Sequence, residues 1–224
     1  MKTHFHTLLA KGLERLGLEI GDDACDRLFI YFTELKKWNK KVNLVARRTS
    51  DDDLVENHFL DSLALVPALA KNGTHLLDIG SGAGFPGLVC KAVLQEMTVT
   101  LVEPRLKRVA FLKHIIRLLE LKNVQVLACR IEDESALDSN LELSHITCRA
   151  VAELRDFLEM VKRFSPSKAR VVCMKGPRWK KEIAEVEVSE LPFVLGGVEE
   201  YTLPFSGGQR SLLFFDYNNS KEGI

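Results

Sequence analysis

The first third of the chain carries apolar residues at helical spacing. Residues 3–17 and residues 22–38 each show apolar positions three and four apart, which predicts two amphipathic helices. Ser50 is followed three residues later by Asp53, a pattern typical of a capping box, and it predicts a third helix over residues 50–69. We therefore expect a helical segment before the first strand.

From residue 74 onward, short apolar runs that favour strands alternate with longer helical stretches. This alternation is typical of βαβ units around a parallel sheet. The predicted strands cover residues 75–79, 99–102, 124–127, 146–148 and 170–174, and the predicted helices cover 87–95, 106–120, 153–164 and 178–188. Two last strand-like runs, 201–203 and 211–215, favour an antiparallel pair that closes the sheet.

Together these patterns predict an α/β fold, a doubly wound, Rossmann-like domain with an N-terminal helical cap. We expect the helical extension over residues 1–73, the Rossmann-like domain over 74–217 and a short tail over 218–224. No linker separates the first two parts, so we expect one compact unit.

Composition narrows the class of protein. The 224 residues are 46% hydrophobic, which suffices for a sizeable core in one domain with an extension. No apolar run approaches the ~20 residues that a membrane span needs, and no secretory signal is visible. Five scattered cysteines without a C-x-x-C pair argue against a disulfide framework and against a metal site. We expect a soluble, cytoplasmic monomer without membrane contact.

The formal net charge is zero, but the charges are segregated along the sequence. Residues 36–48 and 162–181 contain many lysines and arginines and no acid, and residues 105–122 contain six basic residues and one acid. Each block has two interpretations. It is a solvated face of the protein, or it joins the other blocks in a surface that binds a polyanion such as RNA.

The most specific local motif is the loop LLDIGSGAGFPG over residues 76–87, which follows a predicted strand and precedes a predicted helix. Its last three glycines match the dinucleotide fingerprint, whereas its acid and first three glycines match the loop of S-adenosylmethionine-dependent methyltransferases. We favour the methyltransferase interpretation, because Asp78 suits a cationic methionine moiety and would repel a pyrophosphate. Pro86 also removes a helix-start N–H group that a pyrophosphate would bind.

Two later acidic positions fit a bound nucleoside. Glu103 ends the second predicted strand, where a carboxylate accepts hydrogen bonds from ribose hydroxyls in either cofactor class. In a methyltransferase, Ile131 and Glu132 after the third strand pack on the adenine and bind its edge. Taken alone, both acids are equally ordinary helix-start residues, so the sequence leaves these interpretations open.

The segment after the fourth predicted strand offers no acid–base pair. It lacks the Asn-Pro-Pro-aromatic motif of amino-group methylation, and Cys148 is its nucleophile candidate. Attack of a thiolate on a pyrimidine ring is one interpretation, and a small buried apolar residue is the one we favour. An acceptor such as guanine N7 carries a lone pair and no proton, so it needs positioning rather than a general base.

Short sequence elements spread over residues 5–216 carry a family resemblance. They are Lys37-Trp38-Asn39-Lys40, Asn43-Leu44, His58, Asp61-Ser62, the glycine loop with Phe85-Pro86-Gly87, Lys107-Arg108-Val109, Phe111-Leu112, Arg149-Ala150 and Met174-Lys175-Gly176. In these elements and their order, the chain resembles the RsmG (GidB) family of small-subunit ribosomal RNA guanine-N7 methyltransferases.

The resemblance implies a class I methyltransferase that uses S-adenosyl-L-methionine, releases S-adenosyl-L-homocysteine and methylates N7 of one guanine near the decoding site of 16S rRNA in the 30S subunit. With the glycine-loop motif, the implied donor contacts are Asp78, Gly80, Gly82, Gly84, Phe85, Glu103, Ile131, Glu132 and Arg149. Two positions depart from the family. Phe85 stands where many members have leucine, and Thr147-Cys148 precedes Arg149 where the family often has a serine.

Arg149 is the one candidate for a catalytic role, which it would fill by positioning. A guanidinium repels a sulfonium, so we expect Arg149 to bind a carboxylate, of the donor or of the protein, or a target phosphate. The alternative is a surface arginine at a strand end. His58 and Asp61 share a predicted helix face, and they either fix the cap to the sheet, which we favour, or border the target base.

The predicted RNA contacts lie mostly in the basic blocks. They are Lys36, Lys40, Lys41, Arg47, Arg48, His58, Lys175 and Arg178. Trp38 is predicted to pack in the core rather than stack on a base, because it continues the apolar stripe of its helix. An NAD-dependent oxidoreductase, a non-catalytic RNA-binding protein and a small-molecule methyltransferase remain alternative functions.

Overall fold

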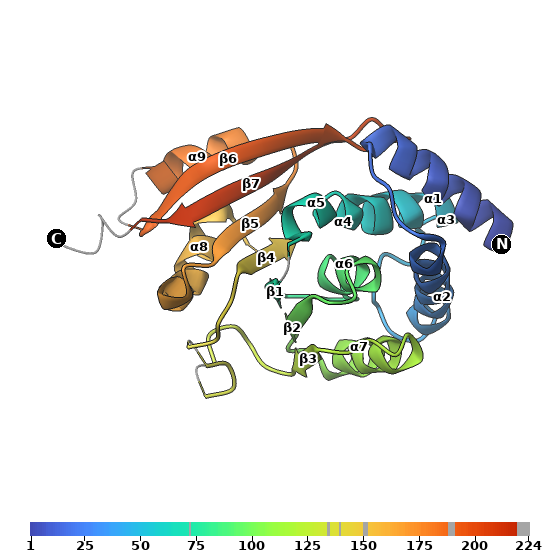
Figure 1. Cartoon of the computed structure of the whole chain (residues 1–224), viewed down its shortest axis with the longest axis horizontal. Coiled ribbons are helices and arrows are strands. Elements are labelled where there is room, and N and C mark those ends of the chain that lie inside the picture. The colour runs from blue at the N-terminus through green and yellow to red at the C-terminus, as the bar shows by residue number, and fades with distance from the viewer. Residues whose placement is uncertain (72, 134, 139, 150–151, 188–190, 219–224) are drawn as a thin grey trace.

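A central sheet with helices on both faces forms the protein in the computed structural model, which describes residues 1–71, 73–133, 135–138, 140–149, 152–187 and 191–218 (Figure 1). The strands of this sheet are β1 (His75–Ile79), β2 (Thr98–Val102), β3 (Val124–Leu127), β4 (His145–Arg149), β5 (Arg170–Lys175), β6 (Phe193–Thr202) and β7 (Gln209–Tyr217). They lie in the order β3-β2-β1-β4-β5-β7-β6.

Strands β1 to β5 run parallel, and β7 enters antiparallel between β5 and β6. Ile79 at the end of β1 is level with Val102 of β2 and Cys148 of β4. The loops after these three strands therefore meet at one edge of the sheet. Since β7 is antiparallel, its start lies at the same edge, where Ser211 is level with Lys175.

The helices divide between the two faces. They are α1 (Lys2–Leu16), α2 (Asp22–Asn39), α3 (Asp51–Leu54), a π-helix η1 (Val55–Leu60), α4 (Asp61–Leu63), α5 (Val66–Leu69), α6 (Gly87–Val93), α7 (Leu106–Leu118), α8 (Leu154–Val161), a 3-10 helix η2 (Lys162–Ser167) and α9 (Trp179–Glu187). Figure 1 shows α1 to α7 on one side of the sheet and α8 and α9 on the other. None of the described helices combines the length and apolarity needed to cross a bilayer.

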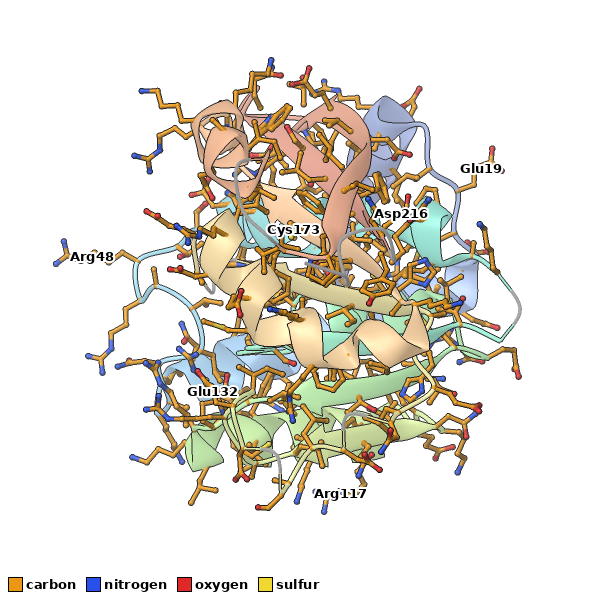
Figure 2. The ribbon with its side chains drawn as sticks, turned by 90° about the vertical axis from the view of Figure 1, so that its left-hand side faces the viewer. Glu19, Arg48, Arg117, Glu132, Cys173 and Asp216 are labelled. Atoms are coloured by element: carbon orange, nitrogen blue, oxygen red, sulfur yellow. The ribbon has the colours of Figure 1, made fainter. Side chains whose placement is uncertain are left out.

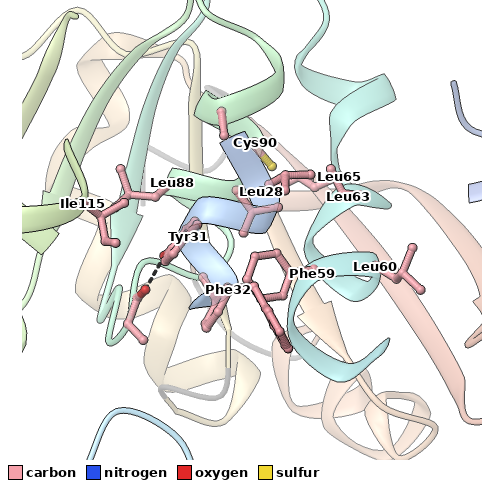
Figure 3. Packing of buried hydrophobic residues seen from close by; sticks show 14 of the residues in the cluster. Leu28, Tyr31, Phe32, Phe59, Leu60, Leu63, Leu65, Leu88, Cys90 and Ile115 are labelled. Carbon is pink, nitrogen blue, oxygen red and sulfur yellow. Dashed lines mark hydrogen bonds between the residues drawn. The ribbon is translucent and has the colours of Figure 1, made fainter. Parts of the chain in front are cut away.

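The sheet separates two apolar cores, as period-2 alternation requires. Along β1, Leu76 belongs to the core under α1, α2, α6 and α7, and Leu77 belongs to the core under α8. Figure 3 shows the first core, in which Tyr31 of α2 and Phe59 of η1 pack beside Leu88 of α6. The N-terminal helices thus share one core with the sheet, and the division at residue 73 stays a prediction.

The prediction of one continuous helix over residues 50–69 is wrong. Its start is confirmed, because Ser50 Oγ accepts a hydrogen bond from Asp53 N at 3.0 Å. The chain then passes from α3 into the π-helix η1 and turns after α4, and Pro67 lies in the first turn of a separate short helix. The remaining predicted helices agree to within a few residues, although residue 188 of the last one lies outside the described residues.

The predicted strand over residues 201–203 is too short and ends one residue too late, because β6 extends from Phe193 to Thr202. Most of this edge strand is exposed or half-buried, so it lacks the alternation that marks a strand in sequence. Its pairing with β7 also shifts register between Leu195 and Gly197. Of the predicted tail, residues 219–224 lie outside the described residues.

Candidate functional site

The glycine loop lies at the edge where β1, β2 and β4 end. Gly80, Gly82 and Gly84 have φ of 68°, 60° and 92°, in the left-handed region that side chains with a Cβ rarely adopt. The turn from β1 into α6 therefore requires glycine at these three positions.

The glycines of this loop differ in what surrounds them. A Cβ on Gly84 would overlap Tyr31 Oη, and one on Gly87 would lie 2.7 Å from Asp78 Oδ2. A Cβ on Gly82 would instead lie 3.8 Å from Arg108 Nη1 and from Gly80 O, an ordinary van der Waals distance. Packing thus excludes a Cβ at Gly84 and Gly87, whereas at Gly82 only the positive φ disfavours one. Tyr31 also donates a hydrogen bond to Ala83 O, drawn as the dashed line in Figure 3.

Asp78, at the end of β1, is fully buried beneath the loop. Its Oδ2 accepts a hydrogen bond from Gly87 N at 3.0 Å and so fixes the start of α6. Among the described residues, Oδ1 has no hydrogen-bond partner. Burial raises the pKa of this carboxyl to about 6. The second oxygen thus leaves one acceptor directly beneath the loop, although the Asp78 side chain has no exposed surface.

Glu103 closes the same cradle from the end of β2. Its Oε2 accepts from Gly82 N at 2.9 Å, its Oε1 accepts from Arg105 N at 2.8 Å, and Arg108 Nη1 lies 3.7 Å from Oε2. A carboxylate has about four lone-pair positions, so roughly two remain for hydroxyl donors. The residues thus fit a ribose, although Glu103 also stabilises the loop itself.

The loop after β3 completes this side of the edge. Ile131 is buried and its carbonyl accepts from Arg163 Nη2 at 2.7 Å, while Arg163 Nη1 donates to Leu137 O at 3.1 Å. Glu132 is exposed and lies toward the left of Figure 2, as Arg48 does. Arg163 comes from the basic block over residues 162–181, and it joins this loop to η2 rather than facing a polyanion.

Arg149 ends β4 and is held by three acceptors from the N-terminal segment. Its Nη1 donates to Asn57 O at 2.9 Å and to Asp61 Oδ2 at 3.2 Å, and its Nη2 donates to His58 Nδ1 at 2.9 Å. The guanidinium also lies 5.0 Å above the centre of the Phe85 ring. The expectation that Arg149 reaches a carboxylate is confirmed, with Asp61 as the protein acid. Nε and one hydrogen of Nη2 have no acceptor in the described part of the chain.

His58 and Asp61 meet at Arg149. Burial and the nearby Arg149 charge lower the pKa of His58 to about 4, so the ring is neutral at pH 7. Because Arg149 only donates, His58 Nδ1 is the acceptor and Nε2 carries the proton. Both side chains bind Arg149 of β4, which supports the interpretation that they fix the cap to the sheet, and their place beside the target base stays a prediction. His58 also stacks on Phe85, with ring centres 5.0 Å apart.

Two residues of the site have no signal in the sequence. Tyr201 Oη donates to Asp61 Oδ1 at 2.8 Å, and Arg210 Nε lies 3.4 Å from the same oxygen. These partners are separated from Asp61 by more than 130 positions, and neither belongs to a local motif. The topology that brings β7 to this edge creates the contact.

The predicted RNA contacts divide into paired and free cations. Lys36 pairs with Asp51 at 2.6 Å, and Lys175 pairs with Glu182 at 2.7 Å, so both are engaged within the protein. His58 is engaged by Arg149. The exposed members are Lys40, Lys41, Arg47, Arg48 and Arg178. We call the first four of these, all between residues 40 and 48, the basic segment.

The basic segment lies beside Arg108, which is also close to Glu103. Arg108 of α7 donates to Asn43 O at 3.4 Å, and this contact joins the basic blocks over residues 36–48 and 105–122. A hollow of about 400 Å³ lies between residues 43–47 and Arg108. Not every residue of the block over 162–181 joins this surface, because Arg170 at the start of β5 pairs with Asp216 at 2.7 Å.

Two further predictions concern the core. Trp38 packs against Phe111 and His114, with ring centres 5.6 and 5.2 Å apart, so the core interpretation is confirmed. Cys148 is buried and level with Cys173 of the neighbouring strand. Burial and the second thiol hold the pKa of Cys148 well above its usual range, which disfavours a reactive thiolate.

Comparisons with known proteins agree with this geometry. The family model described as GidB, rRNA small subunit methyltransferase G, matches residues 24–213. The chain is 46% identical to the Ribosomal RNA small subunit methyltransferase G of Desulfotalea psychrophila, covering 95% of this chain and 99% of the relative. A second relative of that name, from Syntrophotalea carbinolica, is 36% identical over 90% of this chain and 93% of its own length.

A solved structure supports the fold. A mutant of MtNAS in complex with S-adenosylmethionine superposes with a TM-score of 0.57 at 15% identity, covering 88% of this chain and 76% of that one. At this identity, the likeness concerns the fold alone.

Proposed function

The chain belongs to the GidB family, the rRNA small subunit methyltransferase G family, and from this premise we propose that it transfers the methyl group of S-adenosyl-L-methionine to N7 of a guanine in 16S rRNA. Its partner is then the 30S subunit or a precursor of it, its by-product is S-adenosyl-L-homocysteine, and it acts in the cytoplasm, where bacterial ribosomes are assembled.

The observation that carries the proposal is the convergence of three groups at one edge of the sheet. The backbone of Gly82, the buried carboxylate of Glu103 and the guanidinium of Arg149 come from the ends of three neighbouring strands. Glu103 suits the ribose hydroxyls, the unpartnered Asp78 Oδ1 suits the ammonium group, and the free donors of Arg149 suit the carboxylate of the methionine moiety. Ile131 and Glu132 would then border the adenine.

When bound, the donor supplies a sulfonium-activated methyl group. The protein's part is to position the acceptor and to exclude water. Phe85, between Tyr31 and His58, provides a rigid apolar wall, with ring centres 5.8 and 5.0 Å away. Arg149 is held by its three acceptors before any ligand arrives, so binding need not order it.

The acid–base properties of the site favour an acceptor that needs no deprotonation. His58 Nδ1 is already occupied by Arg149, and Asp78 is buried under the loop. Cys148 is held as a thiol, which speaks against covalent attack on a pyrimidine. Guanine N7 presents a free lone pair, so it matches a site without a general base.

We assign the RNA phosphates to the basic segment, with Arg178 as a further contact. The segment is exposed and adjoins Arg108, which touches Glu103. Exposed cations that are not paired within the protein release counterions when they bind phosphate, so affinity should fall steeply with salt.

The experiment is the transfer of labelled methyl from S-adenosylmethionine to 30S subunits from a strain that lacks this enzyme, with the product nucleotide mapped by mass spectrometry. We expect one 7-methylguanosine in 16S rRNA. Subunits from the parent strain, already modified, serve as the control and should accept no label. Binding of S-adenosylmethionine without transfer to any form of the subunit would contradict the proposal.

A further inference from the structure

The carboxylate of Asp61 joins two arginines that come from different strands. Its Oδ2 lies 3.2 Å from Arg149 Nη1, and its Oδ1 lies 3.4 Å from Arg210 Nε. Tyr201, level with Arg210 on the paired strand β6, donates to Oδ1 at 2.8 Å. A single buried carboxylate is therefore shared by two guanidinium groups.

This cluster carries an excess of positive charge. Asp61 contributes one negative charge and the two arginines contribute two positive charges, while Tyr201 and His58 are neutral at pH 7 because burial raises the pKa of the first and lowers that of the second. Two further charged residues touch the β6–β7 turn. Glu56 accepts from Phe205 N and Ser206 N, and Arg15 donates to Pro204 O. Their opposite charges cancel, so one positive charge is in excess among the residues that contact Asp61 and the β6–β7 turn.

Arg210 is the more open of the two arginines. Its side chain is 29% exposed, against 17% for Arg149, and its Nη2 has no acceptor among the described residues. Nη1 donates to Gln209 O at 3.0 Å, which orients the guanidinium. The group is thus held on one side by protein and presents donors on the other.

We propose that Arg210 binds a backbone phosphate of the RNA strand beside the target guanine, with Asp61 holding it next to Arg149. This proposal rests on the proposed function and extends the contacts to RNA beyond the basic segment. A phosphate suits the fork geometry of a guanidinium and the excess charge of the cluster.

The carboxylate of the donor is already assigned to the free donors of Arg149. β4 and β7 are separated by β5, so the backbones at the start of β7 and the end of β4 lie about two strand spacings, or ~10 Å, apart, while the two side chains approach each other at Asp61. Arg149 and Arg210 also bind different oxygens of Asp61. A small ligand held by Arg149 therefore leaves Arg210 to a second anion, and in an RNA substrate that anion is a phosphate.

The test compares Arg210→Gln with Tyr201→Phe, which removes the neighbouring hydrogen bond to Asp61 without changing charge. Dissociation constants for unmethylated 30S subunits are measured at several salt concentrations, beside the affinity for S-adenosylmethionine and the melting temperature. We expect R210Q to bind subunits about 10-fold more weakly and to lower the salt slope by ~0.7–0.9, the value of one phosphate contact. Y201F should leave that slope unchanged, and both variants should keep the affinity for the donor.

If Arg210 only pins the hairpin to Asp61, R210Q and Y201F will behave alike and the salt slope of R210Q will equal that of the wild type, which overturns the proposal. Should R210Q fail to fold, Arg210→Met takes its place, because it keeps the apolar stem of the side chain and removes the charge. A slope lowered by about one contact in R210M supports the phosphate contact, and a wild-type slope contradicts it. Since these measurements concern binding, a wild type that binds subunits but methylates nothing would contradict the proposed function and leave this test intact.

Discussion

Asp61, the first residue of α4, and Arg149, the last residue of β4, form an ion pair of 3.2 Å with side-chain exposures of 7% and 17%. The pair connects the N-terminal helices to the strand end that faces the proposed methyl-transfer site. Through this pair the N-terminal segment fixes the orientation of Arg149, the arginine that we propose binds the donor.

Replacement of Asp61 should therefore affect both stability and function. Asp61→Ala leaves Arg149 partly buried without a counter-charge, and we expect a loss of about 3 kcal/mol in the free energy of unfolding. Donor affinity should fall at least 10-fold, because the guanidinium loses its orientation. Urea unfolding and calorimetric titration measure the two effects.

The matched control for this change is Asp216→Ala. Asp216 pairs with Arg170 at 2.7 Å, but the two side chains are 41% and 45% exposed, so the loss should stay below about 1 kcal/mol. Donor affinity should be unchanged. Equal losses of unfolding free energy in the two variants would show that burial does not strengthen the contribution of the Asp61 pair to stability.

The lowered pKa of His58 makes stability depend on pH. The folded-state pKa is about 4 and the unfolded value is about 6.5, so the unfolded chain binds more protons between these values. Stability should then fall as the pH drops from about 6.5 to about 4, by up to roughly 2–3 kcal/mol for this residue. His58→Asn keeps an acceptor near Arg149 and removes the titration, so its stability should change less over this range.

His145 requires a parallel measurement. Its pKa is also lowered to about 4, first by burial, and it begins β4 at the opposite edge of the sheet. His145→Asn should flatten the same pH range without any change in donor affinity. If neither variant alters the difference in unfolding free energy between pH 7 and pH 5, the neutral state of these histidines is refuted.

Much of the fold could be predicted from the sequence because local patterns determine it. Alternating apolar runs and helical stretches located β1 to β5 and their crossover helices, and the glycine loop located the donor edge. The partners of Arg149 were harder to predict from the sequence, because Asn57, His58 and Asp61 lie about 90 positions away along the chain. Their meeting depends on the π-helix η1, which interrupts an apparently regular helix.

The start of β6 and the role of Arg210, both in the C-terminal part of the chain, could not be predicted from local sequence patterns either. An edge strand exposed along most of its length has no apolar alternation to detect. Arg210 stands in a short polar stretch that looks like an ordinary turn, and its charge matters only because β7 runs antiparallel to β5 and begins at the donor edge. Long-range topology, rather than local composition, assigns it to the site.

Two glycines of the donor loop should respond differently to alanine. Gly82→Ala introduces a Cβ that meets its neighbours only at van der Waals distance but at a φ of 60°, so we expect about 1–2 kcal/mol of strain and a loss of donor binding of at least 10-fold. Gly84→Ala would overlap Tyr31 and lie 2.9 Å from Leu88 Cδ1, so its main effect should be on folding. Urea unfolding and calorimetric titration with S-adenosylmethionine, applied to both variants, test whether G82A mainly loses donor binding and G84A mainly loses stability. Normal donor binding by a folded G82A would mean that the ligand does not approach this backbone.

Cys148 should be dispensable for the reaction. It is a buried thiol with a raised pKa, and the proposed transfer to guanine N7 forms no covalent intermediate. We expect Cys148→Ala to retain kcat within about threefold and to lose ~1 kcal/mol of stability through the vacated volume. Cys173→Ala, level with it on β5, is the control for packing alone. A loss of more than 100-fold in C148A, with C173A active, would restore the covalent alternative.

The basic segment should account for much of the salt dependence of subunit binding. Its four cations are exposed and lie next to the donor edge, so their replacement by glutamine removes up to four phosphate contacts. Each contact contributes ~0.7–0.9 to the slope of log affinity against log salt, and we expect the slope to fall by about 3. Donor affinity should stay unchanged.

Lys71 and Lys122 are also exposed, but they precede β1 and β3 at the opposite edge, and their double replacement by glutamine is the control. A slope that falls by the same amount per removed charge in both variants would mean that net charge, rather than the position of the basic segment, governs recognition of the subunit.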